Sequence, residues 1–418
     1  MNSSVSRGLL TDRIGIGVLT RIVPRDVVDE VLLATGRREK RRRLLPARVV
    51  VYFVLAMSLF FDDGYEELIR KLVWGLEFLG VWRKEWSIPT TGALSQARAR
   101  LGEEPLRELF DRVAVPTARP GTRGAWLGSW RLMAIDGTVF DVADTPGNEA
   151  AFDRYRGPDK PGPFPQARVV GLAECGTHAI VVADIGGVRT GEHELARNLI
   201  PFIEPDMLVM ADRGFYGLHM WTQFLATGAD LLWRVSNSVG LPAYEVLPDG
   251  SYRSVLATAR EQRLLKNKTA RDLGITEADG IAVRVIEYEI ANREGHGERI
   301  RLITSIIDPL DAPAIELAAA YQQRWEFEIS LAELKTTQRG SRRVLRSKSP
   351  DMVRQELWGL LLTHYAIRTL IREAADDLNE DPDRISFIRT LRVIRRQVTD
   401  QAAFSPSPTE ESNHPNNP

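Results

Sequence analysis

The sequence has few of the residues that build disulfide-linked or zinc-scaffolded proteins. Its 418 residues include six histidines and one cysteine, Cys175. One cysteine excludes an intramolecular disulfide and a cysteine-rich zinc site. Its place in a strand-like run favours a packed small residue over a nucleophile. Because His178, His193 and His219 show no metal-ligand spacing, surface or packing roles are the favoured interpretation for them.

Long apolar segments and a secretory start are also missing. The first residues, MNSSVSRGLL, contain no signal-peptide core. The longest apolar run, VVVYFVLAMSLFF at 49–61, is too short to span a bilayer, and Arg48 and Asp62 flank it, so we expect a buried helix. These absences predict a cytoplasmic protein with no membrane segment.

The charge is almost balanced overall but unevenly distributed. The formal net charge is −1, so no global basic field indicates nucleic acid. Basic residues nevertheless gather in three runs, at 37–48, 335–348 and 389–397. Such runs are usually solvated loops, but three on a near-neutral chain predict local patches that bind a polyanion.

The hydrophobic periodicity changes several times along the chain. Residues 1–125 favour helices, among them 90–102 (TTGALSQARARLG), with Arg98 and Arg100 predicted to be exposed. That helix resembles the recognition half of a helix-turn-helix, as many ordinary helices do. From residue 128, strand-like runs alternate with two helices, which predicts a mixed α/β sheet with helices on its faces.

The alternation breaks after residue 236. A Pro-Asp-Gly turn and a second strand pair predict a β-rich insertion, which a helical segment follows. We therefore divide the chain into an N-terminal helical domain (1–125), a first part of the core (126–236), the insertion (237–303), a second part of the core (304–348), C-terminal helices (349–400) and a polar, proline-rich tail predicted to be disordered (401–418).

One predicted helix carries a stripe of chemically distinctive side chains. Tyr321, Arg324, Glu328 and Lys335 have the spacing Y-x2-R-x3-E-x6-K. At about 100° per residue they share one narrow face about 21 Å long. The stripe predicts a site for metal and phosphate, although a solvated face with an incidental ion pair is the open alternative. The neighbours predicted to turn it towards protein are Trp325, Ile329 and Ala332, whereas Glu326 and Glu333 fall roughly 120–140° away.

Two aspartates lie within or directly after apolar strands. Asp136 stands in MAIDGT, and Asp212 follows MLVMA and opens DRGFY. A carboxylate on a buried strand costs on the order of several kcal/mol unless it is paired or bound to metal. The alternatives are a turn-capping aspartate before Gly137 and an ordinary turn with Gly214. Together with Glu328 the two aspartates supply three carboxylates, the hard oxygen ligands that suit Mg²⁺.

Three converging carboxylates can hold two metal ions for an in-line phosphoryl transfer. In that arrangement Lys335 would grip the backbone of a DNA strand, and Arg324 and Tyr321 would clamp nearby phosphates. Arg213 is equally suited to contact DNA or to pair with a core carboxylate.

These motifs together resemble one protein family. DGT at 136–138, DRGFY at 212–216, the intact Y-x2-R-x3-E-x6-K at 321–335 and VLRSKSPDMVRQELWGLLLTHYAIR at 344–368 resemble the DDE transposases of the insertion-sequence-four family. The N-terminal helical stretch is similar to the family's N-terminal domain, and this resemblance implies DNA-end binding for residues 1–125. The resemblance covers roughly residues 10–375, and no catalytic position departs from the pattern.

The resemblance implies a fold, a reaction and partners. The fold class would be α/β, a ribonuclease H-like mixed sheet flanked by helices, with a β-rich insertion and an N-terminal helical domain. The bacterial enzyme would use two Mg²⁺ ions, or Mn²⁺ in their place, held by Asp136, Asp212 and Glu328. It would nick insertion-sequence ends and transfer strands to target DNA.

The partners that the resemblance implies are double-stranded DNA, as terminal inverted repeats and as target, and a second copy of the chain on paired ends, in the nucleoid of the cytoplasm. Several family members use a DNA hairpin intermediate, which an aromatic residue of the insertion would help to stabilise. The predicted insertion has no tryptophan, so Tyr244, Tyr252 or Tyr288 would serve.

Two other functions compete with this interpretation. A catalytically silent DNA-binding protein derived from a transposase would not need three buried carboxylates. A ribonuclease H-like nuclease with another substrate would not need the large insertion or the stripe. Cleavage assays on a terminal repeat would separate the first alternative, because a pure binder shifts DNA without cutting it.

Overall fold

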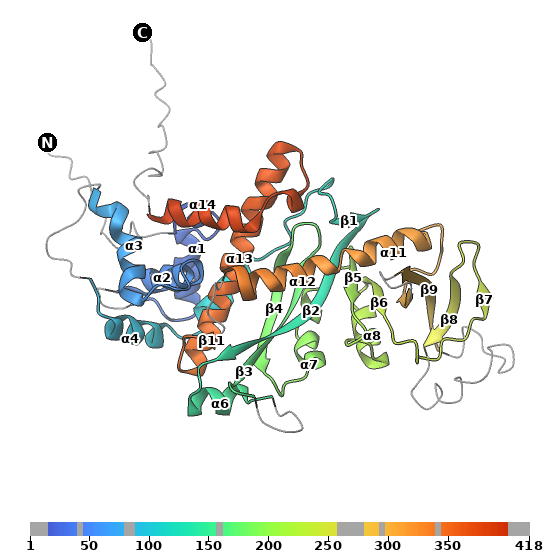
Figure 1. Ribbon diagram of the computed structural model, residues 1–418, viewed down its shortest axis with the longest axis horizontal. Coiled ribbons are helices and arrows are strands. Elements are labelled where there is room, and N and C mark those ends of the chain that lie inside the picture. Colours follow the sequence, from blue (N-terminus) through green and yellow to red (C-terminus); the bar gives the residue numbers. More distant parts are fainter. Residues whose placement is uncertain are drawn as a thin grey trace, which may run out of the picture.

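The computed structural model describes residues 16–39, 45–78, 88–155, 162–256, 280–291, 297–338 and 344–399. The predicted tail, parts of two basic runs (40–44 and 339–343) and the turn at 292–296 lie outside these residues, as does 257–279 of the insertion. Figure 1 shows a central sheet with the N-terminal helices at one end and strands of the insertion at the other.

The N-terminal part is helical, as its sequence predicts. Its helix α2 is buried on every side because it is apolar all round, and this confirms the buried helix expected at 49–61. Pro46 precedes its first residue in an extended conformation. The elements are η2 (Gly17–Arg21), α1 (Arg25–Ala34), α2 (Ala47–Leu59), α3 (Tyr65–Phe78), α4 (Thr91–Leu101) and α5 (Glu104–Val113).

Arg98 of α4 differs from its prediction. Its side chain is fully buried, whereas Arg100 two residues later is exposed. The Arg98 guanidinium donates hydrogen bonds to Gln355 and Ser347, which lie far along the chain. The expectation that both arginines are exposed is therefore wrong, and α4 is anchored to the rest of the molecule by the residue that was expected to face outward.

The described strands form one sheet of 11 strands, nine of which follow the order β4-β3-β2-β5-β6-β10-β9-β8-β7, while two short strands, β1 and β11, each pair with β2. Strands β2, β3 and β4 form an antiparallel meander, and β5 and β6 continue from β2 in parallel. This arrangement confirms the predicted ribonuclease H-like fold class. The first strands are β1 (Trp126–Leu127), β2 (Trp130–Val142), β3 (Gln166–Glu174), β4 (Ala179–Gly187), β5 (Met207–Ala211) and β6 (Asp230–Arg234).

The strands of the predicted insertion extend the same sheet. Strand β10 pairs antiparallel with β6, and β9, β8 and β7 follow outward, so the core and insertion share one hydrogen-bonded surface. The predicted hairpin around Pro-Asp-Gly is the β7–β8 pair. These strands are β7 (Glu245–Val246), β8 (Tyr252–Leu256), β9 (Ile281–Ala291) and β10 (Gly297–Thr304); the short β11 (Val344–Leu345) pairs with β2.

Helices cover the two faces of the sheet. Successive residues of a strand point to opposite faces. On β2 the side chain of Asp136 lies towards Arg324, which directly precedes α12 (Trp325–Ala332), whereas a Cβ at Gly137 would meet Glu192 of α7. The helices between strands are α6 (Pro146–Phe152), α7 (Glu192–Arg197), η3 (Ile200–Phe202) and α8 (Leu218–Leu225).

The C-terminal helices join the N-terminal helices to the core. Helix α13 (Pro350–Leu378) is buried along most of its length and packs against α2, α5 and β4. It is followed by η6 (Pro382–Arg384) and α14 (Phe387–Thr399), which lies beside the N-terminal helices (Figure 1). None of the helices in the described residues has both the length and the apolar character needed to cross a bilayer.

Candidate active site

The first predicted carboxylate lies at the centre of the sheet. Asp136 is the seventh of the 13 residues of β2, which the apolar run from Leu132 to Ile135 places in the core. Its Oδ1 atom accepts a hydrogen bond of 2.7 Å from the Gly137 amide. Its side chain is 23% exposed, so it opens to the surface only partly.

The second carboxylate directly follows the neighbouring strand. β5 consists of five buried apolar residues and ends at Ala211, so Asp212 leaves the sheet beside Asp136. Asp212 accepts a hydrogen bond from the Gly214 amide, and a Cβ at Gly214 would approach its Oδ1 to 2.9 Å. His193 Nε2 lies 2.7 Å from the Gly214 carbonyl oxygen. The turn therefore has contacts on both sides that fix the Asp212 side chain.

The helix with the third carboxylate is not the continuous α-helix that the spacing predicted. Two residues, Gln323 and Arg324, separate helix α11 (Ala314–Gln322) from α12 (Trp325–Ala332), which passes directly into the π-helix η5 (Glu333–Gln338). A fixed angle of 100° per residue holds only within an α-helix. The predicted position of Lys335 on the stripe depends on that angle, and the residue lies in the π-helical segment, so its place on the stripe stays a prediction.

Arg324 connects two of the three carboxylates. Its Nη2 donates to Glu328 Oε1 at 2.9 Å, and its Nη1 lies 3.5 Å from Asp136 Oδ2. The guanidinium also stands over the rings of Tyr321 and Trp325. The structure thus brings Arg324 and Glu328 together, as the stripe predicted, and places Asp136 beside them.

Tyr321 has a different contact from the one expected. The side chain is buried and its hydroxyl donates to the Ala211 carbonyl oxygen at 3.3 Å, next to Asp212. Tyr321 therefore packs the helix against the end of β5. Its contact with DNA stays a prediction, as does that of Arg213, which is exposed in the turn after β5.

The outer border of the stripe also differs from its prediction. Trp325 and Ile329 are 54% and 50% exposed, and Ala332 is exposed, so this side of the helix does not face protein. The buried side is instead the one with Glu326 and Glu333, which the spacing placed away from the stripe. The helix therefore has two polar faces, one towards the sheet carboxylates and one towards the protein interior.

Burial raises the pKa of Asp136 to about 6. The charges of Glu328 and Asp212 raise that pKa further, while the Gly137 amide and Arg324 oppose the rise. All three predicted carboxylates are therefore close enough to influence one another. One guanidinium does not balance their negative charge.

We expect Asp136→Asn to stabilise the protein in the absence of metal at pH 7.5. The folded pKa of about 6 lies above the ordinary value of 3.8, so the stability associated with the protonated group is lost as pH rises through 6. A difference of about two pKa units corresponds to about 3 kcal/mol of free energy of unfolding. Denaturant unfolding in EDTA measures this gain, which should shrink as pH falls below 6; an equal gain at pH 4.5 and 7.5 would contradict the burial of a charged carboxylate as its cause.

The sequence interpretation missed a second group of ionisable side chains. His178 Nε2, a Glu326 oxygen and an Asp383 oxygen all lie within 4.8 Å of one another. Among the residues that the structure describes, the three predicted carboxylates do not form so tight a group. The spacing of Glu326, Ser330 and Glu333, at i, i+4 and i+7, was a signal of a second helical face.

Burial strongly raises the pKa values of the Glu326 carboxyl and the Cys175 thiol. Burial raises the pKa of Glu326 to about 8, against the effect of a hydrogen bond from the Gly176 amide. Burial likewise raises the pKa of the Cys175 thiol, so this residue is a packed side chain, as predicted, and not a thiolate nucleophile.

Comparison with known proteins gives matches along most of the chain. Residues 13–111 match the family described as "Insertion element 4 transposase N-terminal", and residues 130–365 match "Transposase DDE domain". Over 389 residues the chain is 29% identical to the transposase InsG for insertion sequence element IS4 of Escherichia coli strain K12, covering 91% of this chain and 82% of that protein.

Two further proteins are similar at lower identity. The putative transposase InsZ of Escherichia coli strain K12 is 24% identical over 213 residues, which are 50% of this chain and 68% of that protein. Among solved structures, the piggyBac transposase synaptic complex with hairpin DNA gives a TM-score of 0.45 at 10% identity, covering 96% of this chain and 82% of that chain.

Proposed function

Because this chain belongs to the DDE transposases of the insertion-sequence-four family, we propose that it nicks DNA at the ends of an insertion sequence and transfers the freed strands to target DNA. The family membership predicted from the motifs is confirmed. The observation that supports the proposed chemistry is that Arg324 and Glu328, at the start of α12, meet Asp136 of β2, while Asp212 directly follows the neighbouring parallel strand β5.

The carboxylates suit divalent cations. Their donors are carboxylate oxygens, which Mg²⁺ prefers, and the pKa of Asp136 is raised first by burial and then by the negative charges of Glu328 and Asp212. Asp136, Asp212 and Glu328 would hold two Mg²⁺ ions, or Mn²⁺ ions. When bound, such a pair activates the attacking oxygen and stabilises the leaving oxygen of an in-line phosphoryl transfer.

The protein's own side chains would then orient the reactants. The Gly214 amide fixes Asp212, and the Gly137 amide fixes Asp136. Arg324, already hydrogen-bonded to Glu328, would exchange part of that contact for a phosphate oxygen, because a guanidinium binds either anion in the same planar geometry. Tyr321 would keep the helix seated against β5 through the Ala211 carbonyl.

The insertion is the proposed site for stabilising a hairpin intermediate. Of its tyrosines, Tyr252 donates its hydroxyl to Glu287 at 3.0 Å, and Tyr288 is half-buried. Tyr244 precedes the outermost strand and is also half-buried. These tyrosines lie on or beside the strands that extend the sheet outward from β6, so a DNA end held at the carboxylates would have to run along the sheet to reach them. We keep the domain boundaries given in the sequence analysis as part of this proposal. Within them, residues 1–125 would bind the DNA ends.

The function is tested by incubating the full-length chain with a labelled DNA duplex that carries one terminal inverted repeat of its own element. We expect a nick at the element end in Mg²⁺ or Mn²⁺, none in EDTA, and joined products when target DNA is added. Retarded DNA that is never cut would support the alternative, a catalytically silent DNA-binding protein. Sedimentation of the protein with two ends tests the proposed homodimer.

Lys335→Ala should weaken binding of element ends by about 5- to 10-fold without changing the affinity for metal. A cation that contacts a DNA phosphate contributes to affinity independently of sequence, so the slope of log affinity against log salt should fall by about 1. Filter binding across a salt series measures both effects.

Arg189→Ala is the control for Lys335→Ala, because Arg189 is exposed and pairs with Asp153 on the surface. We expect this control to bind DNA as the wild type does. Reduced Mn²⁺ binding by Lys335→Ala would show that Lys335 acts on the metal site and not on the strand.

A further inference from the structure

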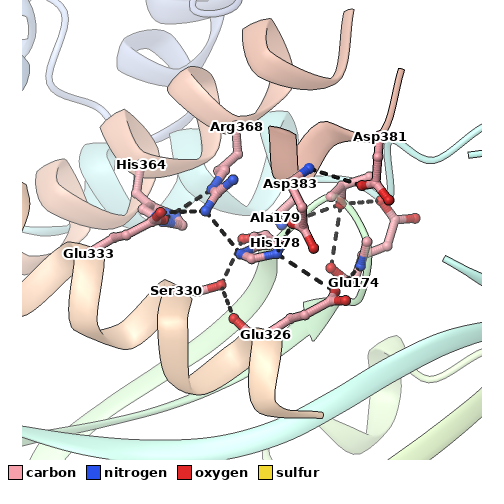
Figure 2. A network of polar contacts seen from close by, with 12 residues as sticks. Glu174, His178, Ala179, Glu326, Ser330, Glu333, His364, Arg368, Asp381 and Asp383 are labelled. Atoms are coloured by element: carbon pink, nitrogen blue, oxygen red, sulfur yellow. Dashed lines mark hydrogen bonds and ion pairs between the residues drawn. The ribbon is translucent and has the colours of Figure 1, made fainter. Parts of the chain in front are cut away.

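The face of α12 that points away from the predicted carboxylates is fixed by a second set of buried polar contacts, shown in Figure 2. Glu326 and Ser330 on α12 and Glu333 at the start of η5 lie on this side, and all three are buried. We call the whole set the back-face network; its members are Glu326, Ser330, Glu333, His178, His364, Arg368 and Asp383.

His178 lies at the centre of this network. It ends the turn between β3 and β4 with a positive φ of 59° and is 3% exposed. Its Nδ1 lies 2.9 Å from Arg368 Nη2, and its Nε2 lies 2.7 Å from Asp383 Oδ1 and 3.7 Å from Glu326 Oε2. Its carbonyl oxygen accepts from the Ser330 hydroxyl at 3.3 Å. One residue thus contacts α12, α13 and η6.

The same turn contacts α12 a second time through its backbone. The Gly176 amide donates to Glu326, and Gly176 has a φ of 76°. A Cβ at Gly176 would lie 2.4 Å from the Arg123 carbonyl oxygen, so only glycine fits. The close approach of this turn to the helix is therefore built into the backbone as well as into the His178 side chain.

Arg368 and Glu333 form the other half of the network. Arg368 Nε donates to Glu333 Oε2 at 3.0 Å, and Arg368 Nη2 also contacts the second oxygen of Glu333. His364 Nε2 lies 3.0 Å from the same carboxylate. This two-point pairing orients the Arg368 guanidinium, which also contacts His178. The contacts of Glu333 and those of His178 are therefore joined through Arg368.

The composition of His178, Glu326 and Asp383 resembles that of a metal site, but the hydrogen bonding argues otherwise. A guanidinium can only donate, so His178 Nδ1 accepts from Arg368 and the proton of the ring is on Nε2. That N–H faces two carboxylates without being aligned with either. Because Nε2 carries a proton, it has no lone pair to offer a cation.

The helix needs such external support because its own hydrogen-bond ladder is irregular at both ends. α12 has eight residues, with a turn before it at Gln323 and Arg324 and a π-helix directly after it. Glu328 is 40% exposed on the open side. A carboxylate that coordinates metal must be held within about 0.5 Å of its productive position. Contacts on the back of α12 supply a restraint that Glu328 cannot supply itself.

We propose that His178, held between Asp383 of η6 and Arg368 of α13, is a positioning residue that fixes the rotation of α12 and thereby the placement of Glu328 against Asp136. This inference rests on the proposed function. It makes η6 part of the frame of the active site, although Asp383 itself stands on the far side of the helix from the reacting groups.

The test uses the full-length chain with His178→Asn, Asp383→Asn and the double variant. Asparagine tolerates a positive φ but is too short to reach Arg368 and Asp383 together. We expect each single variant to lower the single-turnover rate of end cleavage about 10-fold and to raise the half-saturating Mn²⁺ concentration, as loss of support for a metal ligand does. The double variant should be no slower than His178→Asn, because both changes break one contact.

Asp383 is 46% exposed, so Asp383→Asn keeps the test independent of folding. Asp377→Asn, at an exposed position near the end of α13, is the matched control and should cleave as the wild type does. DNA affinity and the thermal unfolding temperature of Asp383→Asn should equal those of the wild type.

Three results would overturn the inference. The first is that both single variants cleave at the wild-type rate at the same Mn²⁺ concentration. The second is a slower rate with an unchanged Mn²⁺ requirement and a lowered unfolding temperature. The third is a bound Mn²⁺ or Zn²⁺ ion that dialysis finds in Glu328→Gln but not in His178→Asn. A wild type that does not cut would instead overturn the proposed function.

Discussion

Replacing Asp136 or Asp212 by Asn, or Glu328 by Gln, should each reduce metal-dependent cleavage of element ends more than about 1,000-fold. Loss of one ligand removes several kcal/mol of charge stabilisation at the transferring phosphoryl group, and each 1.36 kcal/mol is about tenfold in rate. The substituted side chains keep their shape, so DNA-end binding should stay within about twofold of the wild type. A cleavage assay and filter binding on the same preparations measure the two quantities.

The matched control is Asp144→Asn. Asp144 follows the same strand as Asp136 but pairs with Arg154 on the surface, where its side chain is 53% exposed. It should cleave at the wild-type rate. If any of the three carboxylate variants also retained that rate, the assignment of the catalytic group would be wrong, whatever the family of the chain.

The strands that carry the two aspartates could be predicted because their local sequence is decisive. MLVMA has five consecutive apolar side chains, and such a run is stable only where both faces of a strand are buried; the structure has all five buried in β5. Asp212 then follows necessarily at the strand's carboxyl end. Asp136 is inside a long strand for the same reason, and the pairing of β2 with β5 brings the two together.

Placing side chains at 100° per residue predicted the observed contact only where the helix is a regular α-helix. Arg324 and Glu328 are four residues apart and meet, as neighbouring side chains on one face must. The same angle cannot be carried on to Lys335, because the helix changes from α to π at Glu333 and nothing in the sequence marks that change. Trp325 was expected to face protein because apolar residues usually do, yet no described element covers it.

Glu326 and Glu333 could not be interpreted from spacing alone. A helical wheel shows which residues share a face, but not what packs against that face. The partners of these two carboxylates come from His178, about 150 residues earlier in the chain, and from Arg368 on a later helix. Only the folded chain shows that two acidic side chains placed off the stripe are buried and paired, and not solvated.

Arg98 is a similar case, in which local sequence indicated the wrong environment. A basic residue in a helix with serine, glutamine and alanine neighbours is typical of an exposed or DNA-facing surface. The structure instead surrounds its guanidinium with hydrogen-bond acceptors: Gln355 Oε1 at 2.9 Å, the Met352 carbonyl at 3.0 Å and Ser347 Oγ at 3.1 Å, with the Tyr65 hydroxyl as a fourth contact. These partners tie α4 to the start of α13.

The charge of Arg98 is balanced through an intermediate. Ser347 donates both its amide, at 3.1 Å, and its hydroxyl to Glu356, which is 1% exposed. Arg98, Ser347 and Glu356 thus form a buried chain from cation to carboxylate. In a low-dielectric interior, each end of such a chain depends on the other, because an unpaired buried charge is costly.

Arg98→Met should therefore destabilise the protein by about 3–5 kcal/mol, the usual cost of leaving one buried charge without its partner. The change leaves Glu356 without its cation and removes the donor of four hydrogen bonds, while methionine fills most of the volume. We expect a lower thermal unfolding temperature and faster proteolytic release of the N-terminal helices. Arg100→Met, two residues away on the exposed side of α4, should unfold as the wild type does. If Arg98→Met unfolded normally and lost only DNA binding, α4 would be a recognition helix after all, and the buried chain would contribute nothing to holding the N-terminal helices on the core.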